Sequence, residues 1–76
     1  MAIHMNRLES EIDNTLELSA ICRGEWCRAL ESRVNDLDSE LTEVSRVKTI
    51  ADSSRFAMMS DKIRKAYRNL GPNIHV

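Results

Sequence analysis

The feature that most constrains this chain is a line of apolar residues at helical spacing that runs through nearly all of it. Between residues 8 and 44 the apolar positions recur at steps of three and four, with one gap between Leu16 and Trp26, and the pattern returns from residue 56. Because residues three and four apart share one face of an α-helix, this periodicity predicts amphipathic helices. The stripe consists of Leu8, Ile12, Leu16, Trp26, Leu30, Val34, Leu37, Leu41 and Val44, and then Phe56, Met59, Ile63, Ala66, Tyr67 and Leu70.

The composition agrees with this pattern. The chain has 76 residues with only two Gly and one Pro, so it has little material for β-turns or long loops. A chain of this length forms one domain with a thin core. We therefore expect a single all-α domain over residues 1–76.

Two helices are expected, and the first is much the longer. Asn6 followed by Glu9 fits a capping box at its start, and Gly24 is the only weak point before residue 45. The stripe keeps its phase across Gly24, because residues 18 positions apart differ by about five full turns and fall on one line. This favours one helix over about residues 6–46 in an antiparallel hairpin, with a three-helix bundle as the alternative if the chain breaks at Gly24.

The second helix is expected over about residues 53–70. It is announced by the capping residues Asp52-Ser53-Ser54 and stopped by Gly71-Pro72, which leaves residues 71–76 as a tail. Residues 1–4 read as a cloning remnant before a native start at Met5. The shorter helix can cover only about residues 28–46. Exposed apolar residues of the first helix would then serve self-association or a second partner: Leu8, Ile12, Leu16 and Trp26.

No cluster of residues suited to chemistry accompanies the stripe. Cys22 and Cys27 would lie about 140° apart on one straight helix, so we expect free thiols, a reducing cytosol and no metal site. His4 and His75 lie near the chain ends, where nothing positions them as a base or ligand. We therefore expect no enzyme activity, no catalytic residue and no cofactor.

Charge is unevenly distributed along the chain although the net charge is only −1. Residues 31–45 carry five acids and one Arg, whereas residues 46–76 carry seven Lys or Arg and two Asp. The simplest interpretation is that an acidic helix pairs with a basic one. A nucleic-acid site is the weaker alternative, because interleaved aromatics are missing, and no apolar run approaches the length of a membrane span. That alternative would use Lys62, Arg64, Lys65 and Arg68.

Two short segments resemble a known family. Arg7-Leu8-Glu9 opens the first helix, and Asp52-Ser53-Ser54-Arg55-Phe56 opens the second, which continues through Lys65-Ala66 to Leu70. In these segments the chain resembles the YscE-type co-chaperones of bacterial type III secretion. One departure is that the expected first helix is longer than is usual for that family.

The resemblance implies a cytoplasmic bacterial co-chaperone. Such a protein pairs with a helical-repeat, TPR-like chaperone, and together they keep the needle subunit soluble before export. A helix in a concave helical groove is held by anchors at i, i+3, i+4 and i+7. The implied contact residues are Phe56, Met59, Ile63, Ala66, Tyr67 and Leu70.

The main alternative is a structural coiled-coil homo-oligomer without a chaperone role. Three residues bear on the choice between a core position and a contact surface. Met58 and Met59 suit either a core or an adaptable binding face, and Trp26 suits either a buried position or an interface anchor. As an adaptor, the chain could still form a weak homodimer.

Overall fold

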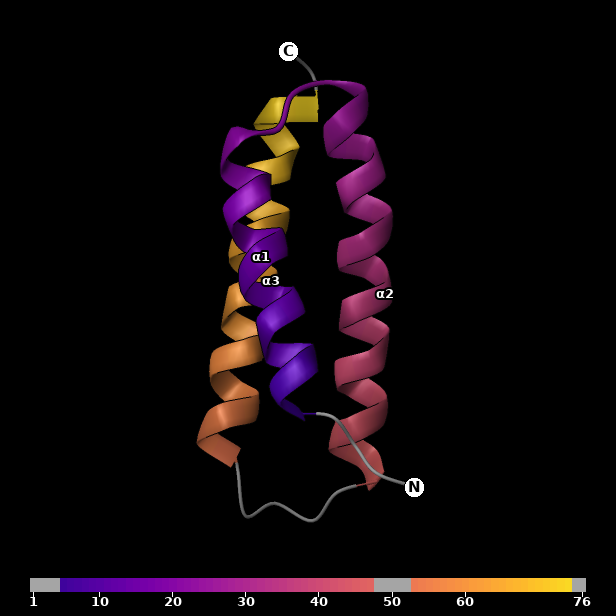
Figure 1. Cartoon of the computed structure of the whole chain (residues 1–76), viewed down its shortest axis with the longest axis vertical. Coiled ribbons are helices and arrows are strands. Elements are labelled where there is room, and N and C mark those ends of the chain that lie inside the picture. The colour runs from indigo at the N-terminus through magenta and orange to yellow at the C-terminus, as the bar shows by residue number, and fades with distance from the viewer. Residues whose placement is uncertain (1–4, 48–52, 75–76) are drawn as a thin grey trace.

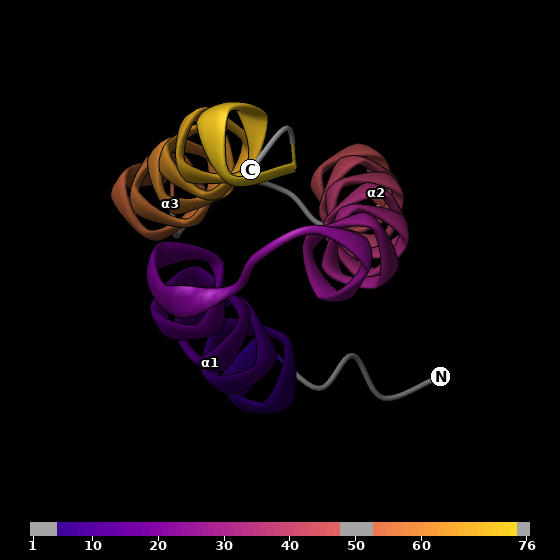
Figure 2. The same cartoon turned by 90° about the horizontal axis from the view of Figure 1, so that it is seen from above.

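The computed structural model describes residues 5–47 and 53–74, which form three α-helices in an up-down-up bundle (Figure 1). Helix α1 spans Met5–Ile21, α2 spans Glu25–Val47 and α3 spans Ser53–Ile74. Seen from above, the helices stand at the corners of a triangle, and each one packs against both of the others (Figure 2). The bundle is elongated, with extents of 41 × 21 × 17 Å.

The all-α fold class is confirmed, but the continuous helix expected over residues 6–46 is wrong. The chain folds back between α1 and α2, so the three-helix alternative describes it. Gly24 has φ of 59°, in the left-handed region that costs an L-residue with a side chain roughly 1–2 kcal/mol. Its carbonyl accepts hydrogen bonds from the backbone N–H groups of Cys27, at 3.0 Å, and Arg28, at 3.3 Å, which close the first turn of α2. Gly24 is therefore the turn between two helices.

Apolar side chains from all three helices form one core. Most of the predicted stripe lies in it, and five half-buried residues pack against its edge: Leu16, Val44, Phe56, Tyr67 and Ile74. The burial of one face of each helix supplies most of the stability of such a bundle. The core consists of Met5, Leu8, Ile12, Cys22, Cys27, Leu30, Val34, Leu37, Leu41, Met59, Ile63, Ala66 and Leu70.

The N-terminal apolar residues have an internal partner after all. Leu8 and Ile12 are buried in the core and Leu16 is half-buried, because the turn at Gly24 lays α1 against α2 and α3. The expectation that this segment needs another molecule to cover it is wrong. Trp26 departs from the pattern in the other direction, since 48% of it is exposed.

The polar contacts at the start of α1 and between the helices also differ from those predicted from the sequence. Arg55 of α3 donates to Glu9, at 2.9 Å, and to the Asn6 side chain, so these two residues bind α3 and not each other in a capping box. Lys62 of α3 donates to Asp13 of α1 at 2.6 Å. Within the described residues, the ion pairs between helices join α3 to α1. The acidic helix α2 and the basic helix α3 do pack against each other, as predicted, but these ion pairs do not join them.

Helix α3 runs through Gly71 and Pro72 and ends at Ile74, so the predicted stop at Leu70 and the predicted tail are wrong for residues 71–74. The last turn is held by contacts that the sequence pattern does not reveal. The Asn73 carbonyl accepts a hydrogen bond of 3.0 Å from the Gly24 N–H, and Ile74 packs against the core. Three expectations fall outside the described residues: the remnant at residues 1–4, the cap at Asp52 and the role of His75.

Candidate functional site

A disulfide joins the two ends of the α1–α2 turn. Cys22 follows the last residue of α1 and Cys27 lies in the first turn of α2, with Cα atoms 5.2 Å apart. Both residues are buried, at 1% and 0% exposure. The prediction of two free thiols is wrong, because it placed both residues on one straight helix. The inference of a reducing cytosol loses its basis with it, since disulfides persist mainly in oxidising compartments.

Polar side chains beside the disulfide tie α1 to the end of α3. Ser19, which is fully buried, donates to the Leu16 carbonyl at 2.6 Å and accepts from the Asn69 side chain at 3.1 Å. The Asn73 side chain donates to the Ser19 carbonyl at 3.1 Å. Buried polar groups need such partners, because an unsatisfied one costs about 1–3 kcal/mol. The disulfide end is therefore held by a bond network as well as by packing.

Outside this tied region the same end carries an exposed apolar surface, which we call the end patch: Leu18, Ile21 and Trp26. Their exposed fractions are 36%, 64% and 48%. Leu18 and Ile21 are three apart and adjacent on the surface of α1. Arg33 donates to Thr15 across the α1–α2 interface at 3.3 Å. Trp26 lies two turns before Arg33 on the same flank of α2, and Leu18 lies one turn beyond Thr15, so both border that interface.

The charges around the end patch are exposed and have both signs. Glu17 lies one turn before Ile21 on α1, and Arg23 and Glu25 flank the turn. No ion pair between described residues involves any of the three, whereas Arg7 and Arg46 pair with acids on their own helices. The end patch thus has an apolar centre and a rim with charges of both signs.

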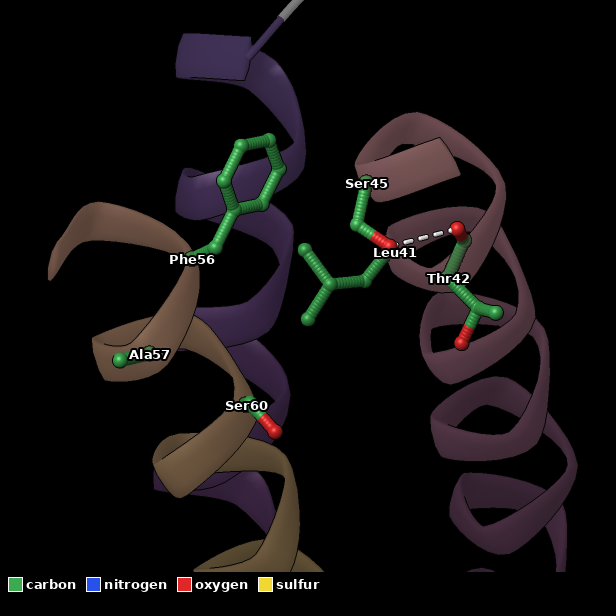
Figure 3. Close-up of a pocket in the computed structure, with 6 residues that line it drawn as sticks. All are labelled: Leu41, Thr42, Ser45, Phe56, Ala57 and Ser60. Atoms are coloured by element: carbon green, nitrogen blue, oxygen red, sulfur yellow. Dashed lines mark hydrogen bonds between the residues drawn. The ribbon is translucent and has the colours of Figure 1, made fainter. Parts of the chain in front are cut away.

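An open groove of about 290 Å³ lies between α2 and α3 at the opposite end of the bundle (Figure 3). Two of its hydroxyl groups bond to their own helix, since Thr42 donates to the Asp38 carbonyl at 2.9 Å and Ser45 to the Thr42 carbonyl at 2.7 Å. The lining of the groove is therefore a mixture of apolar side chains and hydroxyl groups. It is lined by Leu41, Thr42, Ser45, Phe56, Ala57 and Ser60.

The predicted chaperone-binding face of α3 is mostly core. Four of its six residues are at most 4% exposed, namely Met59, Ile63, Ala66 and Leu70. In the closed bundle these side chains contact α1 and α2, so they are not free to contact a partner. Two residues of that face, Phe56 and Tyr67, are half-buried at its edge.

Tyr67 is positioned by α2. Its hydroxyl donates to the side-chain oxygen of Asn35. Burial raises the pKa of Tyr67, and the negative charges of Asp38 and Glu31 raise it further. The phenol is therefore held in its neutral, hydrogen-bonded form, which is a structural role.

The other candidate site residues predicted from the sequence do not come together in one site. Of the four basic residues considered for nucleic acid, Lys62 and Lys65 are engaged by Asp13 and Asp61. Among the described residues, no group of three or more His, Cys, Asp or Glu is placed to hold a metal ion. The disulfide was not predicted, although Thr15, Ser19 and Cys22 continue the spacing of Ile12 with small side chains across the gap in the stripe.

Comparisons with protein-family models, with curated proteins and with solved structures give no match. The resemblance to YscE-type co-chaperones therefore stays a prediction from the residues that suggested it. In residues 5–47 and 53–74, none of the helices has the length and apolar character needed to cross a membrane.

Proposed function

We propose that this chain is a non-catalytic helical adaptor that binds another protein through the end patch. The observation that carries the proposal is the exposure of Ile21 and Trp26 on a bundle whose other stripe residues are buried or half-buried. Single exposed apolar residues are ordinary, but Trp beside aliphatic residues within a charged rim is typical of an interface centre.

The charges around the end patch favour a protein as the partner over a lipid membrane or a nucleic acid. Arg23 and Arg33 balance Glu17 and Glu25 around the end patch, so its rim has no excess of positive charge to attract an anionic membrane or a phosphate backbone. The partner that fits is a helical protein with an apolar groove and a rim with charges of both signs. Such a groove would take the Trp26 side chain as its anchor.

A finer form of the proposal follows from the resemblance. The partner would be a TPR-like chaperone in the bacterial cytoplasm, and the joint cargo would be a type III secretion needle subunit. This form must use the end patch or the exposed edge of Phe56 and Tyr67, because the remainder of the predicted α3 face is buried. The alternative of a structural homo-oligomer is treated in the next section.

Site-specific photo-crosslinking tests the adaptor. We would place p-benzoylphenylalanine at Ile21 and, as the matched control, at Met58, because these side chains are similarly exposed, at 64% and 60%. The chain is irradiated in its own host, and the captured protein is then purified and titrated calorimetrically against the oxidised wild type and Trp26→Ser. We expect an adduct from position 21 but not from position 58, and a Kd raised at least about tenfold by Trp26→Ser.

Equal adducts from both positions, or equal affinity of wild type and Trp26→Ser for the captured protein, would refute the adaptor. The finer form has its own test with purified components. A TPR-like chaperone and a needle subunit are mixed with the chain, and a stable ternary complex is expected in size-exclusion chromatography. Failure of that mixture removes the secretion assignment and leaves the adaptor to the crosslinking result.

A further inference from the structure

We propose that this chain has a second architecture, a helix-swapped dimer of two copies, and that the Cys22–Cys27 disulfide decides between the two. In the dimer α1 and α2 join into one continuous helix through residues 22–24. The α1 segment of each copy then packs on α2 and α3 of the other. The oxidised chain is the monomeric bundle, and the reduced chain forms the dimer.

The first observation is that the turn interrupts a pattern that is continuous in the sequence. Leu8, Trp26 and Val44 are 18 residues apart and would fall on one line of a straight helix. Only Cys22, Arg23 and Gly24 separate α1 from α2. Such a short connection needs few backbone changes to become helical, and short hinges favour the exchange of elements between copies.

The exchange preserves the core contacts. In the bundle α1 runs antiparallel to α2 (Figure 1). If two straightened chains meet around a two-fold axis at the hinge, α1 of one copy lies antiparallel to α2 of the other. Leu8 and Ile12 then occupy the same sites against α2 and α3 that they fill in the monomer. The dimer therefore keeps the core packing that stabilises the bundle, with α1 supplied by the other chain.

The disulfide permits only one of the two forms. Its Cα atoms are 5.2 Å apart in the bent chain. On a straight helix the same residues rise about 7.5 Å along the axis and point about 140° apart, beyond what a disulfide spans. An oxidised chain is therefore restricted to the turn.

Trp26 supplies an independent observation. It is 48% exposed in the bundle although it belongs to the stripe. In the swapped dimer Trp26 lies near the two-fold axis, where the hinge segments of the two copies meet. This new contact between copies covers the indole that the monomer leaves exposed.

The chemical step is thiol–disulfide exchange with a dithiol. One dithiol thiolate attacks a cysteine sulfur and forms a mixed disulfide, and the second dithiol thiol displaces the remaining cysteine. The protein disulfide gains two electrons and two protons, and the dithiol is oxidised to its own disulfide. Because both cysteines are buried, attack requires the turn to open first, and the opened turn is already on the way to the straight helix.

Mass and distance measurements test the proposal. We would follow the native chain by light scattering across about a hundredfold concentration range, oxidised and then reduced with dithiothreitol, and in parallel the variant Cys22→Ala with Cys27→Ala. We expect a monomer when oxidised and a concentration-dependent dimer when reduced or substituted, with a shift of Trp26 fluorescence to shorter wavelength.

Pulsed electron paramagnetic resonance distinguishes a swap from simple association. Spin labels are introduced by Ser10→Cys and Ser39→Cys in the Cys22→Ala/Cys27→Ala chain, at exposed positions of α1 and α2, and diluted with unlabelled chain. The bundle predicts a separation within a chain of under about 20 Å, from the spacing of neighbouring helices. The continuous helix predicts roughly 44 Å, from 1.5 Å per residue.

Two substitutions at the hinge act in opposite directions. Gly24→Ala disfavours the left-handed turn and favours helix, so it should increase the dimer fraction of the reduced chain. Arg23→Pro blocks a continuous helix, and within the described residues no backbone hydrogen bond uses the Arg23 N–H. It should keep the reduced chain monomeric. The proposal is overturned if the cysteine-free chain stays monomeric or unfolds, including with Gly24→Ala, or if its dimer keeps the short distance.

Discussion

The two ends of this bundle are held together by different means. At the end with the open groove, large side chains such as Leu41 and Met59 meet in the core, and Arg55 adds polar contacts at the edge. At the disulfide end α1 and the start of α2 contribute only the small residues Ser19, Cys22 and Cys27 to the core. A covalent bond and the hydrogen bonds of Asn69 and Asn73 act there in addition to the packing of Leu70 and Ile74 from α3.

The difference shows how a short chain can close a bundle when its apolar stripe is incomplete. Large side chains stabilise by the area they remove from water, about 25 cal/mol per Å². Small side chains remove less area, so part of the stability at the disulfide end comes from constraint, and closing a loop this short by a disulfide contributes about 2 kcal/mol. That constraint makes this end the place where conditions outside the chain can change its structure.

The largest loss of stability is expected when a side chain in the packed core is truncated. Met59→Ala removes a side chain with 0% exposure and should lower the free energy of unfolding by about 2–5 kcal/mol, because it leaves a cavity. Met58→Ala is the matched control one residue away, with 60% exposure, and should change it by less than about 0.5 kcal/mol. Urea denaturation of the oxidised chain measures both. Similar losses for the two variants would mean that the packing of α3 is not as described.

A smaller loss of stability is expected when a hydrogen bond at the disulfide end is removed. Asn73→Ala removes the donor to the Ser19 carbonyl and should cost about 0.5–1.5 kcal/mol in urea denaturation. Asn14→Ala, at an exposed position of α1, is the control, and it should leave stability unchanged or slightly higher because Ala favours helix. If Asn73→Ala behaves like the control, the hydrogen-bond network does not stabilise this end.

The ion pairs between α1 and α3 should contribute less to the free energy of unfolding than this hydrogen bond does. Arg55→Ala loses the ion pair with Glu9 and the hydrogen bond to Asn6. A partly exposed ion pair of this kind stabilises the folded state by about 0.2–1 kcal/mol. The loss should shrink as salt is added. Arg46→Ala breaks an exposed pair with Glu43 on one helix and should have little effect at any salt concentration. A salt-independent loss for Arg55→Ala would point to packing of its stem.

The smallest expected effect is a pH dependence of stability that comes from the ionisation of Tyr67. Its pKa is raised in the folded chain, first by burial and then by Asp38 and Glu31. The folded state therefore keeps this proton when the unfolded state loses it. The resulting stability is complete below the unfolded pKa of about 10 and is lost as pH rises through the higher folded value. Thermal unfolding monitored by circular dichroism should show this loss at alkaline pH, and Tyr67→Phe should reduce it.

Periodicity was sufficient to predict much of the core. Leu30, Val34 and Leu37 were expected on one face and are buried together. The same pattern misplaced Trp26, because phase alone does not show where a helix stops. It also missed Ser19, since a small polar residue carries no hydropathy signal even when it lies in the core.

The pattern of residues along the chain predicts the all-α class and the apolar faces of the helices, and it contains no metal-ligand spacing around the cysteines. The turn at Gly24, the bond between Cys22 and Cys27 and the burial of Leu8 and Ile12 within their own chain are seen only in the folded structure. The physical reason is that a helix is encoded by local spacing, whereas a turn depends on contacts made afterwards. The hydrogen bond from Gly24 to Asn73 joins residues far apart in the chain, and no local pattern contains it.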